Sequence, residues 1–360
     1  MSDRLPVAVL GAGGYIGQHF VRLLADHPQF ELVWLGGGER STGQPLGALW
    51  QLEEAPPAGV EGTVLRRTTP AVLARAGVRI AFGGLPSGVA GPVETECARR
   101  GIAVFSNAAD HRMDPDVPLL VPEVNADHLR LLDRRTRGRA PLVTNANCST
   151  TGLVLGLAPV VGLLRPTRIH VATYQALSGA GYPGVASLAI ADNVVPHIPR
   201  EEEKIAQETN RIFGTRTTGR VRARDWPVLA HCARVAVREG HLEAVTVEAA
   251  ARPSLAELTR AWTRFDPLAD ETLPTAPHPP VEVRTETDRP QPLRDRWAGH
   301  PARARGMAAV VGRIRWEPPF LRFFLLSHNA VRGGAGGSVL NAELALARQY
   351  LADRPSGAAE

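Results

Sequence analysis

The chain of 360 residues has an apolar fraction of 44% and a charged fraction of 21%, the composition of a globular protein long enough for two domains. The net charge of +5 comes from arginines spread among acids along the whole chain, which argues against a nucleic-acid interface. No stretch of about 18 apolar residues occurs, so the sequence predicts no membrane span, and the first residues read as a β-strand rather than a secretion signal. Three widely spaced cysteines indicate no disulfide framework, and we expect a reducing, cytoplasmic compartment.

The first part of the chain alternates strands and helices. An apolar run at 5–10 ends at a glycine cluster, a helical pattern follows at 18–28, and a second strand is expected at 31–35. Further strands are predicted at 78–82 and 102–106, with a helix between them. This alternation is typical of an α/β fold with a parallel, doubly wound sheet of the Rossmann type.

The pattern changes at about residue 150. Helices are predicted at 149–164 and 254–264, with strands at 169–177, 242–251 and 308–315. This indicates an α+β domain with a mixed or antiparallel sheet, for catalysis and oligomerisation, and the Pro-, Arg- and Asp-rich stretch 266–306 is expected to run over its surface. We therefore predict a nucleotide-binding domain at 1–148, completed by a C-terminal helix at 329–352, and a second domain at 149–328.

The glycine-rich turn between the first strand and helix predicts a dinucleotide site. In that context glycines permit a tight turn, and backbone amides at the helix N-terminus approach a pyrophosphate. The predicted contacts are Gly11, Gly13, Gly14, Tyr15, Ile16 and Gly17. After the second strand, Glu39 suits the ribose of NAD, whereas Arg40 with Ser41 and Thr42 suits the 2′-phosphate of NADP(H), which we favour.

Cys148 is the candidate nucleophile because it follows an apolar strand end and precedes a helix. A helix N-terminus stabilises a thiolate, and the Asn147 amide beside it is suited to donate to an oxyanion. Cys97 lies in a predicted helix and Cys232 in a predicted strand, so both are expected to be buried structural cysteines. Lys204 is the only lysine among 41 basic residues, which indicates either a position that needs a compact ammonium group or a lysine retained by chance.

Several motifs together carry a family resemblance. They are NANCST at 145–150, QALSGAGYPG at 175–184, EEEK at 201–204, the pair Arg234 and His241, and NAVRGGAGGSVLNAEL at 329–344. With further matches nearly end to end, the chain resembles the aspartate-semialdehyde dehydrogenases, and more closely their archaeal and fungal branch.

The resemblance implies reversible, NADPH-dependent reductive dephosphorylation of L-aspartyl 4-phosphate to L-aspartate 4-semialdehyde, a step of lysine, threonine and methionine biosynthesis. It implies that Cys148 forms a thioester, His241 is the general acid/base and Gln175 orients the intermediate. His241 is expected to titrate near neutrality, as an ordinary histidine does. Substrate binding is implied for Arg234 (α-carboxylate), Glu201 (α-ammonium), and Lys204 with Arg112 (phosphate), and further cofactor contacts for Ser178, Gly179 and Asn341. No metal is expected. Because members of this family form dimers or tetramers, the resemblance also implies a homodimer or homotetramer.

The chain departs from the usual family pattern beside two substrate positions, with Ala233 before the arginine and Asp110 before Arg112. The alternatives are malonyl-CoA reductase, which uses a CoA thioester with the same cysteine and cofactor, N-acetyl-glutamyl-phosphate reductase, and a relative from a specialised pathway. A non-catalytic NADPH-binding regulator is a further alternative. Glu201 discriminates between an aspartate-semialdehyde dehydrogenase and a malonyl-CoA reductase. An acidic side chain is suited to bind the α-ammonium of aspartyl phosphate, and malonate has no such group.

Overall fold

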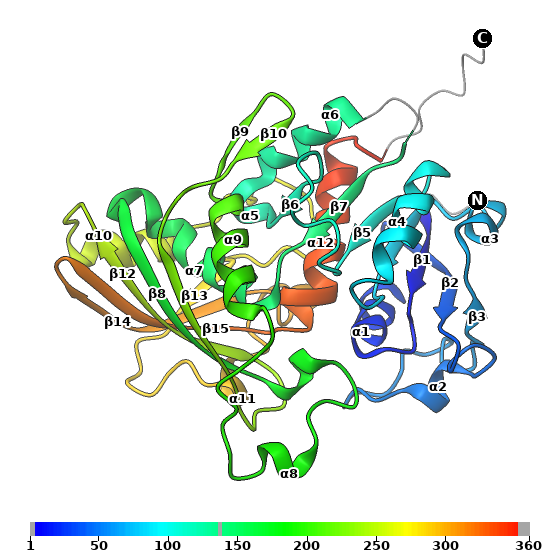
Figure 1. Ribbon diagram of the computed structural model, residues 1–360, viewed down its shortest axis with the longest axis horizontal. Helices are drawn as coiled ribbons and strands as arrows, with labels where there is room; N and C mark the ends of the chain where they lie inside the picture. Colours follow the sequence, from blue (N-terminus) through cyan, green and yellow to red (C-terminus); the bar gives the residue numbers. More distant parts are fainter. Residues whose placement is uncertain (1–3, 136–138, 352–360) are drawn as a thin grey trace.

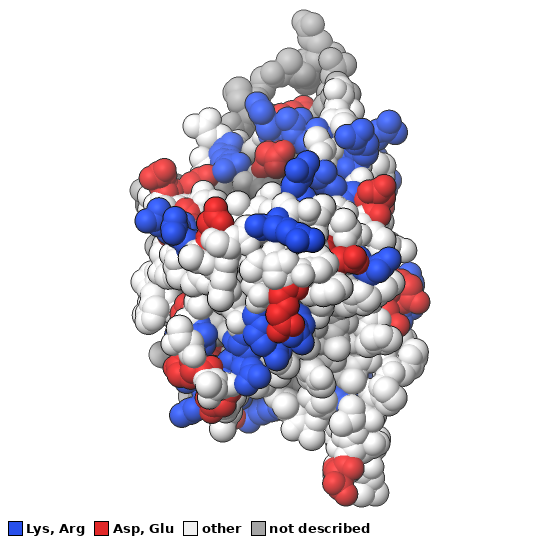
Figure 2. Space-filling view, turned by 90° about the vertical axis from the view of Figure 1, so that its left-hand side faces the viewer, with Lys and Arg blue, Asp and Glu red and all other residues white. Residues whose placement is uncertain are grey.

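The computed structural model describes residues 4–135 and 139–351. Its two large β-sheets lie toward opposite ends of the molecule (Figure 1), and a third sheet has two strands. Within these residues no helix is both long and apolar enough to span a bilayer. Basic and acidic side chains are interspersed on the face drawn in Figure 2.

The first sheet has seven parallel strands in the order β3-β2-β1-β4-β5-β7-β6. Its strands are β1 (Leu5–Leu10), β2 (Phe30–Gly37), β3 (Arg66–Arg67), β4 (Ile80–Gly83), β5 (Ala103–Ser106), β6 (Leu119–Leu120) and β7 (Leu142–Asn145). Its helices are α1 (Tyr15–Leu24), α2 (Leu46–Leu49), α3 (Pro70–Arg75) and α4 (Ala90–Arg99). The Rossmann-type prediction is confirmed. The strand order reverses at β1, so the ligand crevice of such a sheet lies beyond the carboxyl ends of β1 and β4.

The second sheet has six strands in the order β11-β8-β12-β15-β14-β13. They are β8 (Pro166–Gln175), β11 (Val228–Arg234), β12 (His241–Ala249), β13 (Val281–Val283), β14 (Ala309–Glu317) and β15 (Phe320–Ser327). The two outer pairs are parallel and the three inner pairs antiparallel, so this sheet is mixed. Because parallel neighbours need a long crossover, the chain between β8 and β11 carries several further elements. These are η2 (Leu177–Ala180), α8 (Ser187–Ile190), α9 (Glu201–Ile212), β9 (Thr215–Thr217) and β10 (Arg220–Arg222).

The stretch 266–306 differs from the predicted surface excursion. It contributes β13 to the sheet, with Val281 fully buried, as well as α11 (Pro292–Asp295) and η3 (Ala302–Ala304). A strand of three residues is too short to produce the alternation by which strands are recognised in a sequence. The neighbouring α10 (Leu255–Thr263) begins with a capping box in which Ser254 and Glu257 bond each other's backbone.

Helix α7 (Cys148–Leu164) forms the centre of the second hydrophobic core. It is apolar around most of its circumference, as expected of a helix that is buried over most of its length, although Leu163 near its end is 40% exposed. Its residues pack against β12, β14 and β15, and Trp262 of α10 donates its indole N–H to the Gly156 carbonyl at 2.8 Å. The chain between β6 and β7 of the first sheet forms α5 (Pro122–Asn125), η1 (Ala126–Leu131) and α6 (Leu132–Arg135).

The end of the chain returns to the first sheet. After β15 come a π-helical turn η4 (Val331–Ala335) and α12 (Gly336–Ala347), whose Val339, Leu340 and Leu344 join the core of the first sheet. The predicted helix at 329–352 is thus shorter, because its glycine-rich beginning forms the π-turn, and residue 352 lies outside the described residues. The division of the chain at 148 and 329 stays a prediction.

Candidate active site

The two sheets bring Cys148 and His241 into contact. Cys148 is the first residue of α7, directly after the first sheet's β7, and His241 is the first residue of β12 in the second sheet. The Sγ of Cys148 lies 3.2 Å from Nε2 of His241. The other ring nitrogen, Nδ1, accepts the backbone N–H of Ala176 at 3.0 Å. Since Nδ1 is an acceptor, the neutral ring carries its proton on Nε2, facing the sulfur.

Local interactions fix Cys148 at the helix N-terminus. The side-chain oxygen of Asn147 accepts the N–H groups of Ser149 at 3.0 Å and Thr150 at 3.1 Å, and so caps α7. The π-turn η4 closes over the cysteine from the other side. A β-carbon at Gly333 would lie 2.6 Å from Cβ of Cys148, so only glycine permits this approach.

The protonation of both groups differs from the sequence expectation. Burial, with a contribution from the negative charge of Glu201, raises the pKa of the Cys148 thiol to about 12. Arg112, Arg234 and the Ser149 amide oppose that rise without cancelling it. Burial, followed by Arg234 and His328, lowers the pKa of His241 well below its ordinary value. The expected thiolate and near-neutral histidine are therefore replaced by a neutral thiol beside a neutral imidazole, because desolvation penalises both charged forms.

Glu201 gathers three of the other predicted residues. It is 5% exposed at the start of α9, and its Oε1 accepts from Asn147 Nδ2 at 2.9 Å and from Gln175 Nε2 at 3.1 Å. Its Oε2 lies 3.6 Å from Nζ of Lys204, one turn further along the helix. One N–H of the Asn147 amide, expected to serve an oxyanion, is thus taken up by Glu201.

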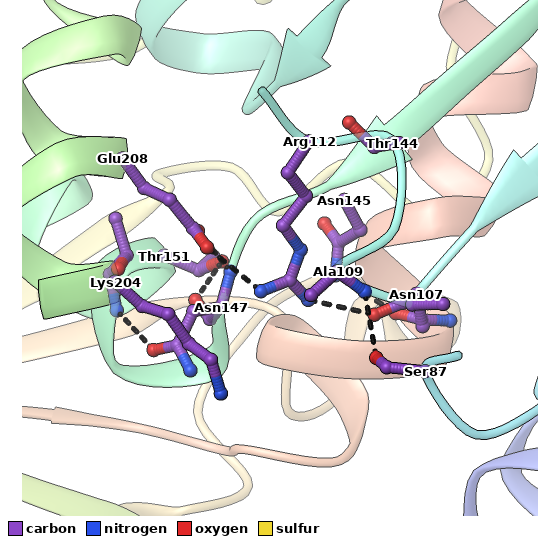
Figure 3. A network of polar contacts seen from close by, with 12 residues as sticks. Ser87, Asn107, Ala109, Arg112, Thr144, Asn145, Asn147, Thr151, Lys204 and Glu208 are labelled. Carbon is purple, nitrogen blue, oxygen red and sulfur yellow. Dashed lines mark hydrogen bonds and ion pairs between the residues drawn. The ribbon is translucent and has the colours of Figure 1, made fainter. Parts of the chain in front are cut away.

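Arg112 lies in the same network through a residue that the sequence reasoning missed. It donates to Oε1 of Glu208 at 2.9 Å and to the carbonyl of Asn107 at 2.7 Å, and Oε2 of Glu208 accepts the backbone N–H of Asn147 at 2.6 Å (Figure 3). Glu208 follows Lys204 by four residues, which places both on one face of α9. That spacing was the available signal. Asp110 caps the start of α4 instead, since it accepts the N–H groups of Gly88 and Gly91.

Arg234, at the end of β11, is held by the same residue as the histidine. Its Nη1 donates to the Ala176 carbonyl at 2.7 Å, and the residue is 7% exposed. A β-carbon at Gly179 would lie 2.6 Å from Nη1 of Arg234 and 3.1 Å from Nε2 of His241. Ser178 accepts from Nδ2 of Asn329 at 2.8 Å. The predicted cofactor positions 178 and 179 thus border the reacting groups.

The glycine turn has the backbone geometry of a tight strand-to-helix connection. Gly11 adopts a φ of +75°, and a β-carbon at Gly17 would lie 2.0 Å from the Gly11 carbonyl oxygen, so glycine is required at both positions. A β-carbon at Gly13 would lie 3.3 Å from Cβ of Ser41, in the loop after β2. The glycine turn and that loop are therefore neighbours.

The remaining predicted cofactor residues lie in different surroundings. In the loop after β2, Arg40 is exposed, Ser41 accepts the Gly38 N–H at 3.0 Å, and Thr42 donates to the Gly38 carbonyl at 2.9 Å. Asn341 lies within α12, 1% exposed, and reaches the Leu120 carbonyl of β6 at 3.4 Å. Among the described residues, no three His, Cys, Asp or Glu side chains are arranged to hold a metal ion.

The two halves of the chain match two protein-family models. Residues 6–132 match the model described as "Semialdehyde dehydrogenase, NAD binding domain", and residues 157–332 match "Semialdehyde dehydrogenase, dimerisation domain".

Similar proteins cover the chain almost completely. An aspartate-semialdehyde dehydrogenase of Methanothermobacter thermautotrophicus is 44% identical over 94% of this chain and 98% of its own length. A malonyl CoA reductase (NADP) of Metallosphaera sedula is 38% identical over 98% of this chain and 100% of its own. The crystal structure of the aspartate-semialdehyde dehydrogenase of Candida albicans with NADP superposes with a TM-score of 0.85 at 33% identity, covering 96% of this chain and 99% of that one. The chain therefore belongs to the semialdehyde dehydrogenase family, within its archaeal and fungal branch of aspartate-semialdehyde dehydrogenases.

Proposed function

We propose that the chain catalyses the reversible, NADPH-dependent reductive dephosphorylation of L-aspartyl 4-phosphate to L-aspartate 4-semialdehyde through a thioester on Cys148. The observation that carries the proposal is the 3.2 Å contact between Cys148 and His241, bordered by Glu201 and Arg234. Relatives named aspartate-semialdehyde dehydrogenase support the same substrate.

The charges around Cys148 match the charged groups of aspartyl phosphate. Arg234 donates one N–H to the Ala176 carbonyl, and its other N–H groups are suited to bind the α-carboxylate. Glu201 accepts the α-ammonium. Lys204 and Arg112 bind the phosphate. Without substrate, their positive charges face the carboxylates of Glu201 and Glu208, and the bound phosphate takes over part of this charge compensation.

In the acylation step, Sγ of Cys148 attacks the acyl carbon, and the carbon–oxygen bond to phosphate breaks. The leaving phosphate takes up the thiol proton, so the thiol needs no low pKa beforehand. His241 donates a hydrogen bond from Nε2 to the oxygen that gains negative charge. The Ala176 N–H holds the ring in this tautomer, and a neutral imidazole fixed as a donor is an effective electrophile for a carbonyl oxygen.

Bound NADPH would supply the hydride that reduces the thioester carbonyl. The carbon–sulfur bond then breaks to release the aldehyde, and the sulfur of Cys148 regains one proton, a transfer for which His241, predicted as the general acid/base, lies 3.2 Å away. The glycine turn is suited to the pyrophosphate, because Gly11 and Gly17 let the chain turn tightly from β1 into the N-terminus of α1. Exposed Arg40 is suited to a 2′-phosphate, together with Ser41 and Thr42. The similarity to the Candida albicans enzyme, whose crystal structure is with NADP, supports the choice of NADP(H). The contacts predicted for Ser178, Gly179 and Asn341 belong to this proposal.

We expect a homodimer or homotetramer assembled through the second sheet. The matching family model is described as a dimerisation domain, and Tyr174 and Leu229 on the adjacent strands β8 and β11 are 41% and 46% exposed. Replacing Leu229 with Glu should shift the mass measured by light scattering toward the monomer. An unchanged mass would move the interface elsewhere. The cytoplasmic compartment stays a prediction.

The substrate is tested by the reverse reaction. NADP⁺ reduction is measured with L-aspartate 4-semialdehyde plus phosphate, with malonate semialdehyde plus CoA, and with N-acetyl-glutamate semialdehyde plus phosphate. We expect phosphate-dependent turnover of the aspartate aldehyde, lost in Cys148→Ala. In Glu201→Gln, the KM for this aldehyde should rise at least tenfold, since a buried charged partner of the α-ammonium is lost. Turnover with malonate semialdehyde and CoA alone would overturn the substrate, as the similarity to the Metallosphaera enzyme allows.

A further inference from the structure

Glu239 forms a charged junction between the two sheets that the mechanism above does not use. Its side chain is 6% exposed, and Tyr15 donates its hydroxyl hydrogen to Oε1. Nε2 of His19 lies 3.7 Å from Oε1, while Nε2 of His328 and Nε of Arg296 lie 3.4 Å and 3.9 Å from Oε2. These four side chains come from α1, from the residue after β15 and from the residue after α11.

Both ends of this junction lead to the proposed site. Tyr15 is the first residue of α1 and part of the glycine turn. Glu239 precedes His241 by two residues, and Gly240 between them has a φ of +96°. The N–H of Gly240 donates to Oδ1 of Asn329 at 2.9 Å, and the amide of Asn329 continues to Ser178. The chain therefore links the acceptor of the Tyr15 hydroxyl, Glu239, through Gly240 to His241.

The carboxylate of Glu239 is ionised in this environment. Burial favours its neutral form, but the contacts with His19, His328 and Tyr15 outweigh that effect and hold the pKa of Glu239 below its usual range. Burial lowers the pKa of His19 to about 4 and also lowers that of His328, so both rings are neutral at pH 7. A buried carboxylate depends on its donors, which makes the Tyr15 hydroxyl a strong contact.

We propose that Glu239 is a positioning residue that couples dinucleotide binding at the glycine turn to the placement of His241 against Cys148. The coupling to catalysis rests on the proposed function, whereas the coupling to the cysteine does not. Coupling between two sites is reciprocal. If the junction is broken, we therefore expect the cofactor to lose its effect on the reactivity of Cys148 and the protein to lose part of its affinity for the cofactor.

The experiment compares wild type, Glu239→Gln, Tyr15→Phe and the double variant. Glu248→Gln is the control, since Glu248 lies on the same strand β12 but pairs at the surface with Arg168. NADPH affinity is measured by fluorescence titration. The rate at which iodoacetamide alkylates Cys148 is measured with and without NADP⁺, with the site of alkylation read by mass spectrometry.

We expect NADP⁺ to change the alkylation rate in wild type and in the control. In Glu239→Gln and in Tyr15→Phe, the Kd for NADPH should rise about tenfold and the NADP⁺ effect on alkylation should disappear, with no further loss in the double variant. In turnover assays, kcat should fall while the KM for the aldehyde stays unchanged.

Several results would overturn the proposal. They are an unchanged Kd and NADP⁺ effect in Glu239→Gln, additive losses in the double variant, and a wild-type alkylation rate that ignores NADP⁺. If Glu239→Gln does not fold, Tyr15→Phe decides alone, because it removes one hydroxyl and keeps the ring. Neither the NADPH titration nor the alkylation assay needs the aspartate aldehyde. A failed reverse reaction with an intact NADP⁺ effect would therefore overturn the proposed function and leave this coupling standing.

Discussion

Glu243 is a buried acid whose replacement should make the protein more stable, increasingly so as the pH rises. It lies two residues after His241 on β12, is 1% exposed, and neither carboxyl oxygen has a hydrogen-bond partner among the described residues. Opposite it, a β-carbon at Gly152 of α7 would lie 3.2 Å from Oε1. Burial, and then the charge of Glu201, raises the pKa of Glu243 well above its ordinary value, so the group is neutral in the folded protein.

The sign of the pH dependence follows from proton binding. Above the unfolded pKa of a glutamate, about 4.3, the unfolded chain releases a proton that the folded chain keeps. The free energy of unfolding of the wild type therefore falls by about 1.4 kcal/mol for each pH unit up to the folded pKa. Glu243→Gln keeps the shape and does not titrate. Its advantage over wild type should therefore grow between pH 5 and pH 8, with an upper bound of about 4 kcal/mol over those three units.

The measurement is urea unfolding at pH 5, 6.5 and 8, followed by tryptophan fluorescence at one protein concentration, because oligomerisation shifts apparent stability. Glu248→Gln, a half-buried position on the same strand whose carboxylate pairs with Arg168, is the control and should show a stability difference that stays flat with pH. A flat difference for Glu243→Gln would contradict this prediction, because it would mean that this carboxyl is ionised or finds a partner in the folded protein.

Two substitutions test the geometry around the nucleophile. Gly333→Ala places a β-carbon 2.6 Å from Cβ and 2.7 Å from Cα of Cys148, so we expect kcat to fall about 100-fold as the cysteine is displaced; wild-type kcat in the reverse reaction would contradict this. Ala176→Pro removes the N–H that holds the His241 tautomer and places the Cδ of proline where that N–H points, against Nδ1 of His241, so we expect kcat to fall at least tenfold and the urea midpoint to fall as well. An unchanged kcat would mean that the tautomer is held in another way.

Much of the architecture was predictable because it rests on local patterns. The alternation of apolar runs and helical spacing predicted the parallel sheet, and the strand-to-helix junction predicted Cys148 at a helix N-terminus. Family motifs named Gln175, Glu201 and Arg234, which lie far apart in the sequence, and the fold gathers them around the cysteine and histidine.

The rest depends on tertiary contacts. The pKa values of Cys148 and His241 differ from those expected because both side chains are buried, and burial is a property of the folded chain. Glu208 and Glu239 escaped notice because an acid in a charged helix or before a strand looks like a surface residue until its partners are known. The strand β13 was missed because three residues give no periodic signal.

A single-turnover experiment shows whether Cys148 forms a thioester. The protein is mixed with L-aspartate 4-semialdehyde and NADP⁺ in the absence of phosphate, and NADPH formation is followed on the millisecond to second scale. We expect a burst of one NADPH per active site, a matching acyl adduct on Cys148 by mass spectrometry, and renewed turnover when phosphate is added. A burst that persists in Cys148→Ala, or steady NADPH formation without phosphate and without an adduct, would contradict the thioester.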